Sequence, residues 1–163
     1  MDAGVSTLQR ARRNTFAALD LDRAHERRDD ADWLAASAVS ASARFLMLDA
    51  QSALLVAGDT TSPCCLDAVQ RARLLPGIPA HLLGVQDATP WFVLRVDDAA
   101  AARVDAALGT RRLRLRDAGL CLDAFFGGLF AYAAGLLQWH ANARFCGQCG
   151  APLQLVAGGH RAN

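Results

Sequence analysis

The chain has 163 residues, 53% of them hydrophobic and 20% charged, which suits one folded domain, or a domain with a small appendage, and excludes a disordered chain. Its formal net charge of +1 excludes a global electrostatic field that would attract nucleic acid or membranes, so any basic binding surface must be local. Glu26 is the one glutamate in the sequence, and this shortage limits the chemistry open to the chain.

Residues 1–31 are charged and irregular, and we expect them to form a poorly structured lead-in. A short helix is predicted to begin near Asp32, where an aspartate precedes a run of helix-forming residues. The apolar runs at 45–48 and 53–57 flank a polar turn and predict a β-hairpin. Residues 65–75 then have the pattern of a helix.

Two further apolar runs, at 80–85 and 91–97, predict a second hairpin, and an alanine-rich helix then ends at Gly109. The sequence TRRLRLRD, residues 110–117, alternates between polar and apolar side chains and predicts a strand. The longest helix is predicted over about 123–142, where apolar residues recur at steps of three and four. Its uncharged stretch is shorter than the about 20 residues of a membrane span, so we expect a buried helix.

The cysteines indicate a reducing compartment. Five is an odd number, their spacing is unlike a disulfide framework, and no secretory signal opens the chain, so we expect a cytoplasmic protein. Cys64 and Cys65 are expected to be buried thiols, because strain disfavours a disulfide between neighbours, and Cys121 is expected in the core.

Cys146 and Cys149 form a Cys-x-x-Cys motif between glycines, in which backbone N–H groups can face two sulfurs that reach one metal ion. A structural zinc ion takes four ligands, commonly two such pairs, and this sequence has one pair. The sequence may therefore be interpreted in three ways: as a fragment cut before a second pair, as a site completed by His160 or by a second chain, or as a thioredoxin-like redox pair. The motif follows a helix rather than preceding one, which disfavours the redox interpretation.

The end of the sequence has Trp139-His140 closing an alanine-rich helix, Phe145 before the Cys-x-x-Cys-Gly motif, then Gly158-Gly159 and Arg161. This arrangement resembles the junction in the NADH pyrophosphatase branch of the Nudix hydrolases, and the upstream residues resemble that family's N-terminal Nudix-like domain. The resemblance implies that Zn²⁺ is held by Cys146, Cys149 and a second cysteine pair. In the full-length protein the Nudix catalytic domain would come after that second pair.

The predicted fold is therefore α+β, with a largely antiparallel sheet, flanking helices and a long helix that leads to a truncated zinc-ribbon knuckle. We divide the chain into four parts: the lead-in 1–31, an N-terminal Nudix-like domain 32–121, a connecting helix 122–143, and the first half of a zinc ribbon 144–163.

Full-length members of this family hydrolyse NAD(H) to NMN(H) and AMP, and some act on NAD-capped RNA. The resemblance implies that Mg²⁺ or Mn²⁺ is held by several glutamates of the Nudix box. Since Glu26 lies outside any such pattern, we expect the chain alone to be catalytically inactive. We expect it to position its absent catalytic domain and to support a homodimer, with Gly127, Ala131 and Gly135 as a candidate packing surface.

The predicted strand at 110–117 places Arg112, Arg114 and Arg116 on one face, and guanidinium groups suit phosphate contacts. The pair Leu115-Arg116 resembles one that the family carries before its long helix, which implies that Arg116 binds substrate. The alternative is a solvated edge whose charge is offset by nearby aspartates, namely Asp97, Asp98 and Asp117.

A function of another class is a stand-alone zinc-knuckle module that binds protein or nucleic acid. The gene sequence downstream of Asn163 distinguishes the two, because an enzyme requires a further cysteine pair and a glutamate-rich box. His140 is expected to be a hydrogen-bonded histidine at a helix end rather than a ligand, and His25 and His81 have no partner cluster in the sequence.

Overall fold

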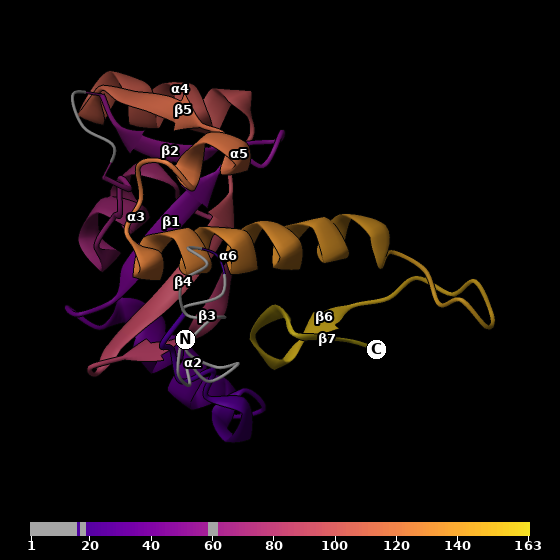
Figure 1. Cartoon of the computed structure of the whole chain (residues 1–163). Coiled ribbons are helices and arrows are strands. Elements are labelled where there is room, and N and C mark those ends of the chain that lie inside the picture. Colours follow the sequence, from indigo (N-terminus) through magenta and orange to yellow (C-terminus); the bar gives the residue numbers. More distant parts are fainter. Residues whose placement is uncertain (1–15, 17–18, 59–61) are drawn as a thin grey trace, which may run out of the picture.

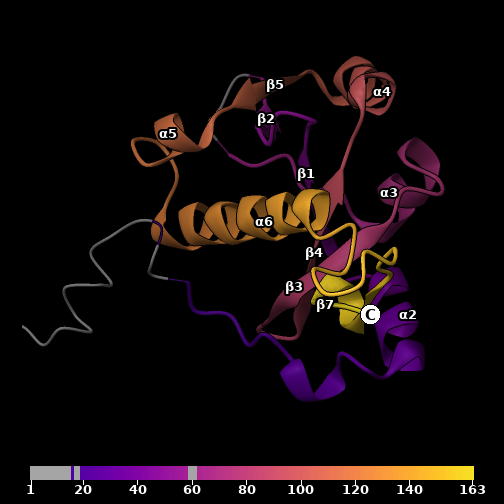
Figure 2. The same cartoon turned by 90° about the vertical axis from the view of Figure 1, so that its right-hand side faces the viewer.

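The computed structural model describes residue 16, residues 19–58 and residues 62–163. A five-stranded sheet forms its centre, with the long helix α6 across one face (Figure 1) and helices α2, α3 and α4 on the other (Figure 2). The elements are η1 (His25–Arg27), α2 (Ala31–Val39), β1 (Arg44–Leu48), β2 (Leu54–Ala57), α3 (Ala68–Leu74), β3 (Ala80–Gln86), β4 (Thr89–Arg95), α4 (Asp98–Leu108), β5 (Thr110–Leu113), α5 (Leu115–Ala118), α6 (Ala124–Asn142), β6 (Leu155–Val156), η2 (Ala157–Gly159) and β7 (Arg161–Ala162).

The sheet has the strand order β3-β4-β1-β2-β5. All neighbouring strands are antiparallel except β1 and β4, which run parallel with Arg44 opposite Trp91. This arrangement confirms the predicted α+β fold with a largely antiparallel sheet. Both predicted hairpins are confirmed as well, β1 with β2 and β3 with β4.

The hairpin of β3 and β4 turns at Asp87 and Ala88, whose φ angles are 47° and 62°. Two successive positive φ angles are the signature of a type I′ turn, whose twist matches that of the flanking strands. The hairpin thus forms locally without glycine at either turn position.

The predicted strand at 110–117 is correct only in its first half. β5 ends at Leu113, and residues Leu115–Ala118 form the short helix α5. The reason is that β2, the strand neighbour of β5, begins at Leu54 opposite Leu113, so the sheet offers no further backbone partner. The chain turns instead and buries Ala118 against the core beside α6.

The sheet is buried on both faces, which gives the chain two apolar cores. Along β1, Leu46 and Leu48 face the core under α6, whereas Phe45 and Met47 face the core under the other helices. All four side chains are fully buried. A strand covered on both faces is a continuous apolar run, as β1 is in the sequence.

Aspartate side chains cap α2, α3, α4 and α6 at their N-termini. Asp97 accepts a hydrogen bond from the Ala100 N–H, and Asp123 accepts one from Phe126, so each satisfies a free donor in the first turn. The cap of α2 is Asp30 rather than the predicted Asp32, which lies in the first turn. The predicted long helix is confirmed as α6. Within the described residues, none of the helices has the length and apolar character that a membrane span requires.

The described end of the lead-in contacts both α6 and β3. Gly128 of α6 lies so close to this segment that a Cβ there would be 2.9 Å from the Leu19 Cβ. Asp22 then pairs with Val85 through backbone hydrogen bonds of 3.0 and 2.7 Å. Arg28, only 6% exposed, donates to the carbonyl oxygens of Leu82 and Leu83. Residues 1–15, 17 and 18 of the expected lead-in lie outside the described residues.

Candidate functional site

The cysteine motif forms a tight turn just after α6. Phe145 bridges to Pro152, the Cys146 N–H donates to the Ala151 carbonyl at 2.8 Å, and the Gly150 N–H donates to the Cys146 carbonyl at 2.8 Å. Gly150 has a φ of 73°, in the left-handed region that glycine adopts without strain. The two cysteines are thereby held on one turn of backbone.

The geometry of this turn suits thiolate sulfurs. Hydrogen bonds from the backbone N–H groups of Cys149 and Gln148 to the Cys146 sulfur, joined by one from the Cys149 thiol, lower the pKa of Cys146. Both cysteines are free and reach the surface. The donor set therefore fits two of the four ligands of a structural zinc ion.

Among the residues that the structure describes, no group of three or more His, Cys, Asp or Glu side chains is placed to hold a metal. His160, the other predicted candidate, is engaged elsewhere: its Nε2 donates to the Leu82 carbonyl at 2.6 Å, and its Nδ1 lies 3.4 Å from the Tyr132 hydroxyl. The structure thus gives no support to a third ligand from His160.

After the knuckle, a small hairpin formed by β6 and β7 folds back against the domain (Figure 1). Its turn contains Gly158 and Gly159, with φ angles of 64° and 92°. We refer to residues 144–163, which comprise the knuckle and this hairpin, as the ribbon segment.

Three histidines dock the ribbon segment onto the domain. His140, near the end of α6, donates from Nε2 to the Gly159 carbonyl at 2.6 Å, so it is the hydrogen-bonded helix-end histidine that we expected. The His81 ring lies 4.3 Å from the His140 ring, centroid to centroid, in an edge-on arrangement. A Cβ on Gly159 would come within 2.5 Å of the His81 Nδ1. The segment and the domain are therefore in direct contact.

The burial of this contact keeps His81 and His140 neutral. Burial, and to a smaller extent the neighbouring His140, lowers the pKa of His81 to about 4. Burial also lowers the pKa of His140; the hydrogen bond to the Gly159 carbonyl opposes this effect, and the Arg95 charge adds to it. The sequence indicates no partner for His81. Its one local sign of this contact is the pair Gly158-Gly159, since glycines allow a close approach of backbone to a side chain.

A bidentate ion pair adds a second link. The Arg161 guanidinium donates to the two Asp29 carboxylate oxygens at 2.8 and 3.1 Å. Both side chains are exposed, so the pair contributes little free energy by itself. It does tie the ribbon segment to the stretch of chain before α2.

The predicted row of three arginines does not exist, because β5 ends before Arg114. Arg112 forms a bidentate pair with Asp105 at 2.9 and 3.0 Å, and its Nε lies 3.4 Å from an Asp49 oxygen. The hydrogen bond from Arg112 is the main cause of the lowered pKa of Asp105. Arg112 is thus engaged within the domain.

Arg116 lies on α5 and is 82% exposed, with its Nε 3.6 Å from an Asp117 oxygen. Of the aspartates expected to offset the arginines, Asp117 is the one that pairs with Arg116, whereas Asp97 caps α4. The guanidinium remains accessible to a ligand, and its role in substrate binding stays a prediction.

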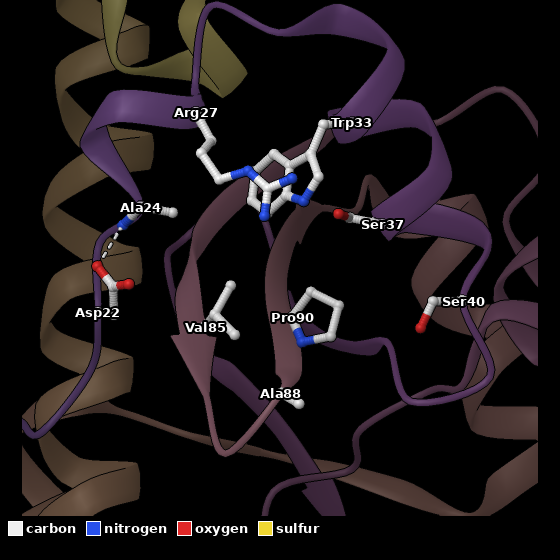
Figure 3. Close-up of a pocket in the computed structure, with 9 residues that line it drawn as sticks. All are labelled: Asp22, Ala24, Arg27, Trp33, Ser37, Ser40, Val85, Ala88 and Pro90. Atoms are coloured by element: carbon white, nitrogen blue, oxygen red, sulfur yellow. Dashed lines mark hydrogen bonds between the residues drawn. The ribbon is translucent and has the colours of Figure 1, made fainter.

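A pocket of about 310 Å³ lies between α2 and the hairpin of β3 and β4 (Figure 3). The Arg27 guanidinium covers the Trp33 ring at 4.5 Å from its centroid, and Val85 and Pro90 form an apolar wall. Asp22 accepts a hydrogen bond from the Ala24 N–H at 2.8 Å. The pocket contains an arginine stacked on an aromatic ring, and the described residues that line it include no pair of groups suited to acid–base catalysis.

The remaining cysteines also form no disulfide among the described residues, including the adjacent Cys64 and Cys65. Burial raises the pKa of Cys65 to about 12, so this thiol stays protonated at neutral pH. The expectation for Cys121 was wrong: it is exposed, because it lies in the connection between α5 and α6, and its Sγ donates to the Asp117 carbonyl.

The comparisons with known proteins agree with this architecture. The sequence model of the NADH pyrophosphatase-like rudimentary NUDIX domain matches residues 42–139, more than half of the chain. The match contains the whole five-stranded sheet and ends within α6, before the cysteine turn. A comparison with curated proteins gave no match. The chain therefore belongs to the family of NADH pyrophosphatase-like rudimentary NUDIX domains.

Proposed function

We propose that the chain is the non-catalytic N-terminal region of an NADH pyrophosphatase, a cytoplasmic hydrolase that converts NAD(H) to NMN(H) and AMP. The observation that carries this proposal is the order of parts along the chain. The family match runs into α6, and α6 is followed by a turn that presents two thiols for zinc. The lack of a disulfide among the five cysteines, all of which are described residues, supports a reducing compartment.

Catalysis is assigned to a separate Nudix domain of the same protein, where glutamates would hold Mg²⁺ or Mn²⁺. Glu26 lies on η1, and its side chain is 84% exposed. A lone exposed glutamate is not a site for two-metal or one-metal phosphate chemistry. We therefore propose that the chain by itself does not hydrolyse dinucleotides, and that it positions the catalytic domain and supports a homodimer.

In this proposal Cys146 and Cys149 provide two of the four sulfur ligands of a structural Zn²⁺, and a second cysteine pair outside this sequence provides the others. The zinc ion would cross-link the ribbon segment to the polypeptide that carries the second cysteine pair. Its contribution is structural, because four protein ligands leave no open position for a substrate.

Two measurements on the chain test the proposal. Zinc analysis of the purified chain is expected to give well under one ion per molecule, and incubation with NADH and Mn²⁺ is expected to release no AMP above a protein-free blank. Tight binding of one zinc per chain, or release of AMP, would contradict it. The gene downstream of residue 163 gives a third test: a stop codon there would favour the stand-alone zinc-knuckle module.

Arg116 is proposed to contact the substrate phosphates in the full-length enzyme, with its exposed guanidinium as support. Replacing it in that enzyme, R116A, is expected to raise KM for NADH about tenfold, the value of one charged hydrogen bond. The matched control is R73A, which removes an exposed arginine from α3, on the opposite face of the sheet. Equal KM values for R116A and R73A would remove Arg116 from the site.

A further inference from the structure

A second pocket, of about 410 Å³, lies where the domain meets the ribbon segment. Its walls come from three parts of the chain that are distant in sequence: His81 and Arg95 from the sheet, His140 from the end of α6, and Arg144 and Leu155 from the ribbon segment. The contact of Gly159 with the two histidines fixes one side of this pocket. We refer to it as the junction pocket.

The junction pocket is positively charged. It is lined by two guanidinium groups, and among the described residues no aspartate or glutamate lines it. This is unusual in a chain whose 17 basic side chains are balanced by 16 acidic ones. Arg112 and Arg161, by comparison, each hold an aspartate in a bidentate pair.

Arg95 has unused hydrogen-bonding capacity. Its Nη1 donates to the Ala50 carbonyl at 3.1 Å, while its Nη2 is buried and has no hydrogen-bond partner within the part of the chain that the structure describes. A buried donor on a charged group that lacks a partner is costly, more so than a neutral one. An anion in the adjoining pocket would remove that cost if the guanidinium rotated to bring Nη2 to it.

Of the two histidines, His81 is the one whose ring N–H can serve the pocket, because His140 donates its N–H to the Gly159 carbonyl. Their lowered pKa values keep both rings neutral at physiological pH. His140 is fixed by its bond to the Gly159 carbonyl, and no hydrogen bond of the His81 ring to another described residue is present. A neutral imidazole has one N–H donor, which can add to the guanidinium donors around an oxyanion.

We propose that the junction pocket binds a phosphate or pyrophosphate group, held by Arg95 and Arg144 with the His81 ring as a further donor. A guanidinium offers paired donors that match two oxygens of a phosphate, and two guanidiniums with an imidazole can serve three oxygens. A carboxylate has only two oxygens and would leave donors unused. This site is distinct from Arg116, and it does not rest on the function proposed above.

The test uses the whole chain and NMR spectra of the histidine side chains at low chloride concentration. Titration with inorganic phosphate, and separately with pyrophosphate, is expected to shift the His81 and His140 ring signals saturably. Acetate is the carboxylate probe and is expected to give no saturable shift. Saturation by either phosphate probe supports the site and shows which group it prefers; saturation by acetate of equal affinity would overturn the phosphate assignment.

Two variants identify the residues. R95Q and R144Q are each expected to weaken phosphate binding about tenfold, while R73Q, which changes an exposed arginine on α3, is expected to leave it unchanged. Arg144 is exposed and makes no side-chain hydrogen bond to a described residue, so R144Q keeps the test valid even where R95Q disturbs folding through Ala50. Absence of a saturable shift in the unmodified chain, or equal affinity in R144Q and the unmodified chain, would overturn the proposal.

Discussion

Lowering the pH should destabilise this protein already at pH values well above those at which carboxylates titrate. The reason is that His81 must remain neutral to stay in place. Its pKa is about 4 in the folded chain, against an ordinary value of 6.5, and burial is the main cause. Between these two values the unfolded chain binds a proton that the folded chain does not. The free energy of unfolding is therefore complete above about pH 6.5 and decreases as the pH falls toward 4.

The size of this effect follows from the shift itself. Each pKa unit corresponds to about 1.4 kcal/mol, so the shift of His81 is worth roughly 3 kcal/mol as an upper value. His140, whose pKa is also lowered, acts in the same direction. The lowered pKa of Asp105 acts only below its ordinary value of 3.8, outside this window. Such a loss is a large part of the 5–15 kcal/mol typical of folded domains.

The assay is urea unfolding at several pH values between about 7 and about 4.5, followed by tryptophan fluorescence. The H81Q variant is expected to have a clearly shallower pH dependence than the unmodified chain, whatever its stability at neutral pH. H25Q removes a histidine whose side chain is 83% exposed and serves as the matched control. The reasoning is refuted if H81Q and the unmodified chain lose the same free energy over this interval.

Three further outcomes are expected. F130A empties a fully buried position of α6 itself, in the core between α6 and the sheet, and should cost about 3–5 kcal/mol in urea unfolding. G159A places a Cβ against the His81 ring at a φ of 92°, so it should cost about 1–3 kcal/mol and expose the ribbon segment to limited proteolysis. In the native chain Cys65 should resist a thiol reagent at mildly alkaline pH while Cys149 reacts, because burial raises the pKa of Cys65 to about 12.

Matched changes at exposed positions provide the controls. V69A alters a side chain that is 78% exposed on α3 and should change the stability by less than about 0.5 kcal/mol. G135A adds a Cβ at an exposed helical position with open space around it and should be neutral or slightly stabilising. A loss in G135A as large as that in G159A, or a Cys65 that reacts as fast as Cys149, would contradict the packing described above.

Most of the secondary structure could be predicted from the sequence because its signals are local. The hairpins are marked by apolar runs separated by short turns, and α4 ends at Gly109, which has a φ of 61°. The pattern of residues 110–117 was misleading for a reason that is not local. Strict alternation of polar and apolar residues indicates which side chains a strand would bury. A strand also needs a neighbouring strand to pair with, and β2 offers no backbone partner beyond Leu54, which lies opposite Leu113.

The candidate site could likewise be predicted only where its signal is local. The pair Cys146 and Cys149 can be found from spacing alone, because the turn that joins two such sulfurs is short and favours flanking glycines. The meeting of His81 with Gly159 depends on how the ribbon segment folds back over the sheet. No pattern within either stretch of sequence encodes that contact, so the junction pocket could be found only from the structure.

The outer edge of β3 has a consequence for how copies of this protein can associate. The carbonyl oxygens of Leu82 and Leu83 accept hydrogen bonds from Arg28, that of Leu82 also accepts one from His160, and Val85 pairs with Asp22. An edge strand whose polar groups are already occupied cannot template a strand from another molecule. Pairing of β3 with a strand of a second subunit is therefore blocked at this edge, so the five-stranded sheet cannot be extended across two subunits there.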